Sequence, residues 1–212
     1  ASILGREFTM AQLRPLVEEI SEDRLFEVLE EALAARVIEE LPQSVGRYQF
    51  THALIQETLA GELTLTRRVR LHARIAETLE TLYRANAEAH SAELAHHFTE
   101  AQTVLGPEKL VHYSLLAGER ALATYAHEEA LAQFQRALAA KEGQAPSASS
   151  GQAMDNEAAA VLHGLGRAQL DTLAIHQRPE AVASLSHAFN YYAEMGDVAR
   201  AVAVAETPMF AW

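Results

Sequence analysis

The sequence predicts a mainly α-helical protein that begins with a small mixed helix-and-strand domain. Three observations support this prediction. A strand pattern runs directly into a helix at Arg47–Leu63, long stretches after it have the 3.6-residue period of amphipathic helices, and a helix-pair spacing recurs later. We expect a domain over residues 1–63, a helical connector over 64–106 and an α-helical array of antiparallel pairs over 107–212.

The first domain has a characteristic order of elements. Helices are expected over Met10–Ile20 and from Ser21 onward. A strand over Val37–Leu41, a turn over Pro42–Gly46 and a returning strand over Arg47–Thr51 follow them. The order helix, helix, strand, turn, strand is that of a winged helix, so we expect a small winged-helix-like domain.

The second helix argues against DNA binding, which a winged helix most often suggests. Arg24 and Arg36 do not offset its carboxylates against a polyanion, and the net charge of −12 also disfavours a nucleic-acid footprint. We therefore expect no direct DNA binding. The expected buried face carries Leu25, Phe26, Leu29, Ala32 and Leu33, and the outer face carries Glu22, Asp23, Glu27, Glu30 and Glu31.

The strand-to-helix junction holds a candidate anion site. Tyr48 and Phe50 alternate with polar residues, as in a half-buried strand, and Thr51 is the expected N-cap of the next helix. His52 would then lie in the first turn, beside backbone N–H groups that can bind an anion.

The connector begins with a long helix, expected over residues 65–85. Arg67, Arg70 and Arg74 lie on one side of it. They either contact a phosphate or an acidic partner, or form a solvated face that pairs with Glu77 and Glu80, and we favour the solvated face. The opposite, apolar stripe consists of Leu65, Val69, His72, Ala76, Leu79 and Tyr83.

A further helix is expected over Glu88–Glu100, and it is rich in histidine. Glu93 and His97 are one turn apart, as metal ligands would be, and His90 and His96 lie nearby. No HExxH motif is present, so packed or surface histidines explain the pattern and no metal is expected.

The segment Val111–Gln144 carries a repeat signature. The spacing from Gly118 to Ala130, Phe134 and Ala137 matches the tetratricopeptide repeat, two antiparallel helices joined by a turn, here Tyr125–Glu128. A flexible loop is expected over Ala145–Ala153, and Val198–Glu206 resembles the first helix of a third, shortened repeat. Between them lies a weaker copy marked by Leu162, Leu165, Gly166, Ala181, Leu185 and Ala188.

Composition excludes several classes of protein. The chain has no cysteine, which excludes disulfides and thiolate metal sites and suits a cytoplasmic location. It has no apolar run of membrane-spanning length, no P-loop motif GxxxxGK[ST] and no GxSxG elbow, so we expect no membrane span and no enzyme. The first residue is Ala1 and the first methionine is Met10, which indicates a piece of a longer protein.

Four motifs together resemble a known family. ASILGREF, YQFTHALIQETL, RLHARIAETLE and AELAHHF, followed by tetratricopeptide-like repeats, resemble the arm region of STAND-class signal-transduction ATPases, and more narrowly MalT-like regulators of the LuxR family. The resemblance implies a regulatory, sensor and protein-interaction role in transcription regulation. The alternatives are the equivalent arm of an ATPase-linked adenylate cyclase or protein kinase, and a stand-alone scaffold that binds a peptide. The next domain of the full-length chain would distinguish the transcriptional regulator from the ATPase-linked cyclase or kinase.

The resemblance also implies ligands and partners. THALI at Thr51–Ile55 is similar to the MHDLL motif, in which a histidine touches the β-phosphate of ADP, although Ala53 replaces the acidic residue. His52 would contact ADP only together with an ATPase domain of the same chain, so ATP or ADP is a cofactor of the full-length protein and this fragment has none. The other interpretation of His52 is purely structural.

The repeats are expected to bind a partner segment or a small-molecule inducer. Stacked helix pairs form a groove lined by their first helices, and Tyr113, Arg120 and Arg167 are its candidate contacts. Leu115 and Glu119 stand where carboxylate-clamping repeats have Lys and Asn. An acidic C-terminal peptide is therefore not the expected ligand.

Overall fold

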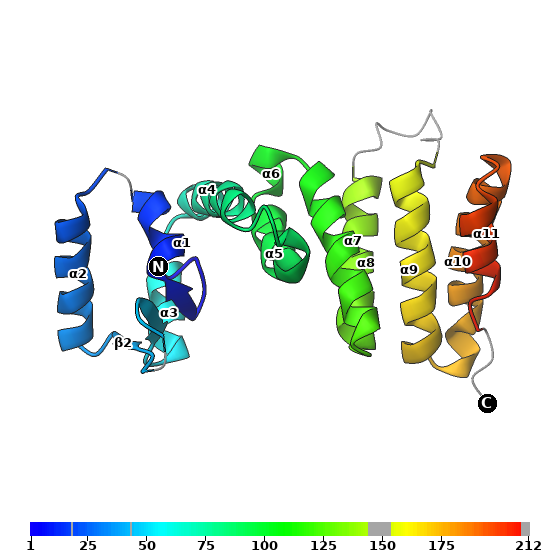
Figure 1. Ribbon diagram of the computed structural model, residues 1–212. Coiled ribbons are helices and arrows are strands. Elements are labelled where there is room, and N and C mark those ends of the chain that lie inside the picture. The colour runs from blue at the N-terminus through cyan, green and yellow to red at the C-terminus, as the bar shows by residue number, and fades with distance from the viewer. Residues whose placement is uncertain (18, 43, 144–153, 209–212) are drawn as a thin grey trace. The chain divides into compact units, whose positions relative to one another are not determined.

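A computed structural model describes residues 1–17, 19–42, 44–143 and 154–208 (Figure 1). The chain is mainly helical and contains a small three-stranded sheet, which confirms the expected fold class at that level. It divides into two compact units, residues 1–87 with 100–105, and residues 88–99 with 106–212. The expected loop over 145–153 lies outside the described residues.

The first unit contains an antiparallel sheet. Its strands are β1 (Glu7–Thr9), β2 (Ile38–Glu40) and β3 (Arg47–Phe50), in the order β1-β3-β2. Ile38 pairs with Phe50, so the expected hairpin is confirmed. The strand β1 was not predicted from the sequence, because three residues give too little alternation to detect.

Aromatic side chains form the core beside this sheet. Tyr48 and Phe50 are buried, as their alternation predicted, and Phe8 of β1 is buried between the same rings. The ring centroid of Phe8 lies 5.7 Å from that of Tyr48 and 5.9 Å from that of Phe50. Aromatic pairs at this separation contribute beyond the area they bury.

The first helix is shorter than expected. Thr9 caps it in a reciprocal capping box with Gln12, but α1 (Met10–Leu13) then gives way to the 3₁₀ turn η1 (Arg14–Val17). Pro15 explains the difference, because proline has no N–H to donate to a carbonyl one turn earlier in the helix.

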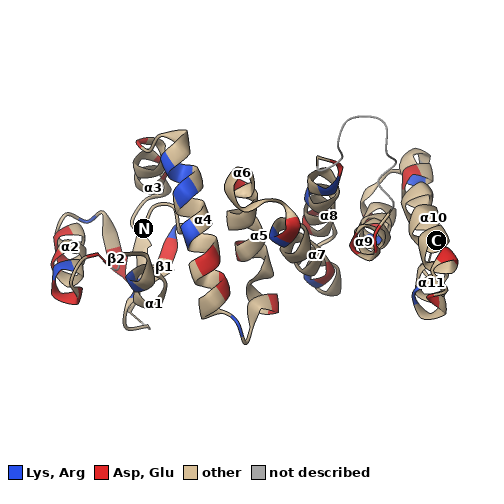
Figure 2. Ribbon diagram, turned by 90° about the horizontal axis from the view of Figure 1, so that it is seen from above, with Lys and Arg blue, Asp and Glu red and all other residues tan. Residues whose placement is uncertain are grey.

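The next three helices each differ in part from the expectation. In α2 (Glu22–Ala34), capped by Ser21, the expected buried residue Phe26 is 43% exposed. The N-cap position of α3 (Ala53–Gly61) is His52, not Thr51. The helix α4 (Leu65–Leu82) ends three residues early and leaves Leu65 exposed. Figure 2 shows basic residues on the first half of α4 and mostly acidic ones on α2. The short helix α6 (Gln102–Leu105) completes this unit.

The second unit is an array of helices that pack in sequence order (Figure 1). The 3₁₀ turn η2 (Ala87–His90) leads into α5 (Ser91–Glu100). After it come α7 (Glu108–Ala123), α8 (His127–Glu142), α9 (Asn156–Thr172), η3 (Ile175–Gln177), α10 (Arg178–Glu194) and α11 (Val198–Ala205). None of the described helices is both long and apolar enough to cross a bilayer.

Small residues allow these helices to approach closely. A Cβ on Gly118 would lie 2.7 Å from the ring of Phe134, and one on Gly164 would lie 2.3 Å from the same ring. Phe134 of α8 is fully buried and so fills the space between α7 and α9. The turn before α8 spans residues 124–126, where residues 125–128 were expected, and it includes Tyr125 at a φ of 60°.

Candidate functional site

A groove of about 450 Å³ lies in the second unit. We call it the α7–α9–α11 groove, because those helices supply most of its walls. Its lining combines apolar residues with several titratable ones, as ligand sites commonly do. The lining residues are Leu122, Tyr125, His127, His163, Arg167, Leu170, Asp171, Ala203, Glu206, Thr207 and Pro208.

Arg167 lies in this groove, but its charge is already paired. Its guanidinium donates to the Glu119 carboxylate over 2.9 Å, and both side chains are partly exposed. An anionic ligand would therefore have to displace Glu119. Without that displacement, the pair leaves little net positive charge for a ligand to recognise.

One histidine of the groove, His163, lies close to this pair. Burial lowers the pKa of His163, and the neighbouring Arg167 lowers it further, although Glu119 acts in the opposite direction. His163 Nε2 lies 3.3 Å from the Thr207 hydroxyl. A lowered pKa keeps this imidazole neutral at pH 7, so it serves as a polar and not a cationic wall.

The carboxylates of the groove are less fully paired with positive charges. Nδ1 of His127 lies 3.1 Å from the Asp171 carboxylate without the alignment of a hydrogen bond, so that contact is attractive only when the imidazole is protonated. Glu206 is exposed and forms no ion pair with any described residue. With Arg167 bound to Glu119, these carboxylates give the groove an acidic character.

The other two predicted contacts lie elsewhere in this unit. Arg120 lines a separate hollow of about 410 Å³ between α7 and the η2–α5 segment, where its guanidinium donates to the carbonyl of Ala89. Tyr113 is buried, with its ring stacked on Phe98 at a centroid distance of 5.4 Å. The structure thus does not bring Tyr113, Arg120 and Arg167 into one pocket.

His127, His163 and Asp171 were not predicted as site residues. A signal for one of them was present, since His163 and Arg167 are four residues apart and therefore share a helix face. The contribution of His127 depends on α8 and α9 being neighbours, which the spacing of the repeat implies but a single helix does not reveal.

His52 lies in the first unit and is exposed. It is the N-cap of α3 with an extended backbone, φ −137° and ψ 138°, and its side chain makes no capping hydrogen bond. The hydroxyl of Thr51 accepts no capping bond and instead donates to the carbonyl of Arg36. The imidazole is therefore not engaged in closing the end of the helix.

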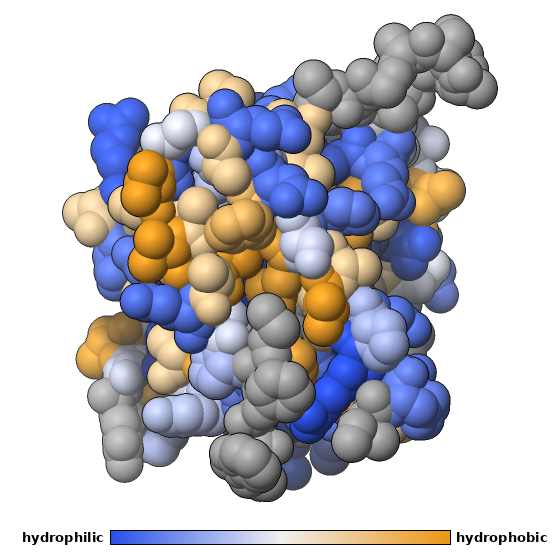
Figure 3. Space-filling model, turned by 90° about the vertical axis from the view of Figure 1, so that its right-hand side faces the viewer, coloured by the Kyte–Doolittle hydropathy of each residue, from blue (hydrophilic) through white to orange (hydrophobic). Residues whose placement is uncertain are grey.

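An apolar patch lies on the outer faces of α10 and α11 (Figure 3). It contains no group that could carry chemistry, but patches of this kind often contact other proteins. The exposed apolar side chains on these two helices are Val182, Phe189, Val198 and Val202.

The chain is thus a mainly helical protein with a small antiparallel sheet, and the lining of its groove is partly apolar and partly acidic. Comparison with protein-family models, with curated proteins and with solved structures gives no match to this chain.

Proposed function

We propose that this chain is a non-catalytic protein-interaction module, and that the α7–α9–α11 groove binds a segment of a partner protein. The observation that carries the proposal is the groove itself, in which helices distant in sequence supply one continuous lining. Arg167 is paired with Glu119 and His127 lies against Asp171, and among the described residues no carboxylate is hydrogen-bonded to the His163 imidazole that faces the Thr207 hydroxyl. This favours binding over catalysis.

The charge of the groove identifies the chemistry of the partner. Leu122, Leu170 and Ala203 can receive an apolar side chain, and Asp171 and Glu206 can pair with a lysine or arginine beside it. Tyr125, 82% exposed at the rim, offers an aromatic face to the same cation. The proposed ligand is therefore a segment with a basic residue next to a large apolar one.

The test is selection of peptides from a random displayed library against the purified chain, followed by calorimetry. Selected peptides should contain this pairing, and the double variant Asp171→Asn/Glu206→Gln should weaken their binding roughly tenfold, as expected for the loss of two exposed charge pairs. The control Glu128→Gln/Glu142→Gln, on α8, changes the net charge of the chain by the same amount as the first double variant. Equal binding to both double variants would refute the proposed site.

We further propose that the first unit is winged-helix-like. Two helical segments followed by the β2–β3 hairpin, with β1 on the other side of β3, support this interpretation. The exposed carboxylates of α2 support a role other than direct DNA binding.

The wider proposal is that the chain serves a STAND-type, MalT-like transcriptional regulator as its sensor and interaction arm, in the cytoplasm. An ATPase domain of the same chain would supply ATP or ADP, and a protein or small-molecule inducer would act at the repeats. The exposed imidazole of His52 supports a phosphate contact there, because no capping bond occupies it. The intact reading frame on both sides is the direct check.

A further inference from the structure

The first half of α4 departs from the charge pattern that stabilises a helix. Residues 65–76 contain Arg67, Arg68, Arg70 and Arg74 and no carboxylate, in a chain of net charge −12. Arginines three and four residues apart repel one another, and cations near a helix N-terminus oppose its dipole. Arg67, Arg70 and Arg74 are exposed and form no ion pair with any described residue. A local pattern that disfavours the helix suggests a functional reason.

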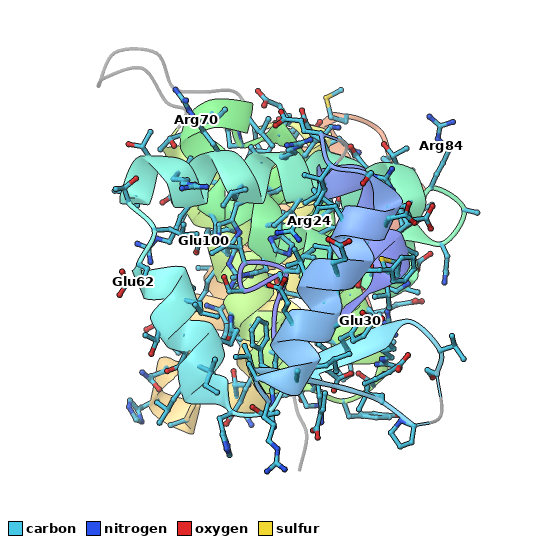
Figure 4. All side chains as sticks on the ribbon, turned by 90° about the vertical axis from the view of Figure 1, so that its left-hand side faces the viewer. Arg24, Glu30, Glu62, Arg70, Arg84 and Glu100 are labelled. Carbon is cyan, nitrogen blue, oxygen red and sulfur yellow. The ribbon has the colours of Figure 1, made fainter. Side chains whose placement is uncertain are left out.

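The same three arginines form a straight row. At 100° per residue, Arg67, Arg70 and Arg74 fall within a 60° sector of α4, and they span about 10 Å along the axis. We call them the arginine stripe. No ion pair joins them to Glu77 in the described part of the chain. In Figure 4 Arg70 lies at the outer edge of α4.

The helix α2 of the same unit carries the opposite charge. It has five carboxylates and one arginine, Arg24, which pairs with Glu27 over 2.8 Å. Asp23, Glu27 and Glu30 are exposed and fall within one 60° sector that also spans about 10 Å. We call them the acidic stripe, and Figure 4 shows Glu30 on the side of α2 that faces the viewer.

The two stripes have complementary spacing. The arginines are separated by three and then four residues, and the carboxylates, read from Glu30 back to Asp23, are also separated by three and then four. Antiparallel helices would thus bring each arginine opposite one carboxylate. A parallel alignment would put the middle pair out of register by one residue, about 1.5 Å.

We propose that the arginine stripe of one copy of this chain docks antiparallel on the acidic stripe of a second copy, Arg67 to Glu30, Arg70 to Glu27 and Arg74 to Asp23. Within one copy no ion pair joins the two stripes, and Arg24, which pairs with Glu27, would share that carboxylate with Arg70 of the second copy. Nucleic acid and anionic lipid fit less well, because the carboxylates of α2 and the net charge repel them. Phe26, 43% exposed and four residues before Glu30, adds apolar area beside the row.

The contact is head-to-tail, so a pair of copies retains one free arginine stripe and one free acidic stripe, and association continues into short open chains. Exposed ion pairs are individually weak and are screened by salt. The association is therefore concentration-dependent and strongest at low ionic strength.

The test exchanges the charges. One variant is Arg67→Glu/Arg70→Glu/Arg74→Glu, a second is Asp23→Lys/Glu27→Lys/Glu30→Lys, and a third combines all six changes and so keeps the wild-type net charge. The control Glu57→Lys/Glu62→Lys/Glu88→Lys matches the second variant in net charge on exposed positions outside both stripes. Circular dichroism verifies that each variant is folded.

Sedimentation velocity at about 20 mM and about 300 mM NaCl gives the readout. The wild-type chain and the control should self-associate at low salt, and each single-stripe variant should lose roughly tenfold in association constant, the effect of a few exposed pairs. The six-change variant should regain the wild-type value. A wild-type chain that stays monomeric at low salt, or a six-change variant that does not regain association, would overturn the proposal.

Discussion

Gly164→Ala is expected to destabilise the second unit, although alanine is the better helix former. In a free helix this change gains about 0.5–1 kcal/mol. Here the new Cβ would lie 2.3 Å from Cε1 and Cζ of Phe134, and that ring is fully buried and cannot swing into solvent. Overpacking a core costs about 1–3 kcal/mol. The net expectation is a loss of roughly 1–2 kcal/mol.

Gly61→Ala is the matched control, because nothing lies within 4 Å of a Cβ there and the residue ends α3. It should be neutral or stabilising. Urea unfolding followed by circular dichroism measures both variants, and amide hydrogen exchange in α8 and α9 assigns the loss to the second unit.

A second substitution identifies the cause. Phe134→Leu removes the ring atoms that the new Cβ would meet, so the double variant should be less destabilised than the sum of the two single variants. A coupling of about 0.5–3 kcal/mol is the usual range for residues in contact. If Gly164→Ala is as harmless as Gly61→Ala, or if the two changes at 134 and 164 are additive, the close packing described for this site is wrong.

Two pH-dependent predictions follow. Burial raises the pKa of Asp155, but hydrogen bonds from Lys141 and the Ala158 amide outweigh it and hold that pKa below its usual value. The stabilisation that Asp155 supplies is thus present above the unfolded-state pKa and lost as the pH falls through the folded-state pKa. Asp155→Asn should therefore reduce the loss of unfolding free energy at acid pH by about 0.5 kcal/mol, a small value because the carboxylate is exposed. His163 has a lowered pKa, so stability should decline as the pH falls below about 6.5. His163→Gln should remove that decline in a urea titration repeated at several pH values, and an unchanged slope would contradict it.

The hairpin was predictable because its residues carry both of the required signals. Tyr48 and Phe50 alternate with polar neighbours, and Gly46 has a φ of 74°, which glycine adopts without strain. The strand β1 was not predictable, because only Phe8 marks it and its partner is some forty residues away. Local periodicity identifies an element, but an isolated edge strand is defined by its pairing.

The groove shows the same limit. The helix pairs were predictable from small residues at fixed spacing, such as Gly118, which lies against the ring of Phe134. The pairing of Arg167 with Glu119 joins residues 48 positions apart on two helices. Sequence identified Arg167 as a cation on a first helix, and only the packing of α7 beside α9 showed that its charge is already neutralised.

The one-residue shift at His52 changes what that residue can do, and it leads to the last prediction. An N-cap is normally Ser, Thr, Asp or Asn, whose side-chain oxygen accepts from the first free amides of the helix. His52 makes no such bond, so this position gives up capping energy that a serine would supply. His52→Ser should therefore stabilise the chain by about 1 kcal/mol in urea unfolding. If the imidazole serves a nucleotide phosphate, the same change in the full-length protein should lower ADP affinity and raise inducer-free output, a gain of stability at the expense of function. His52→Ala separates the two effects, since it removes the imidazole without adding a cap. ADP affinity and basal output that both stay unchanged in the two variants would leave His52 no role in nucleotide binding.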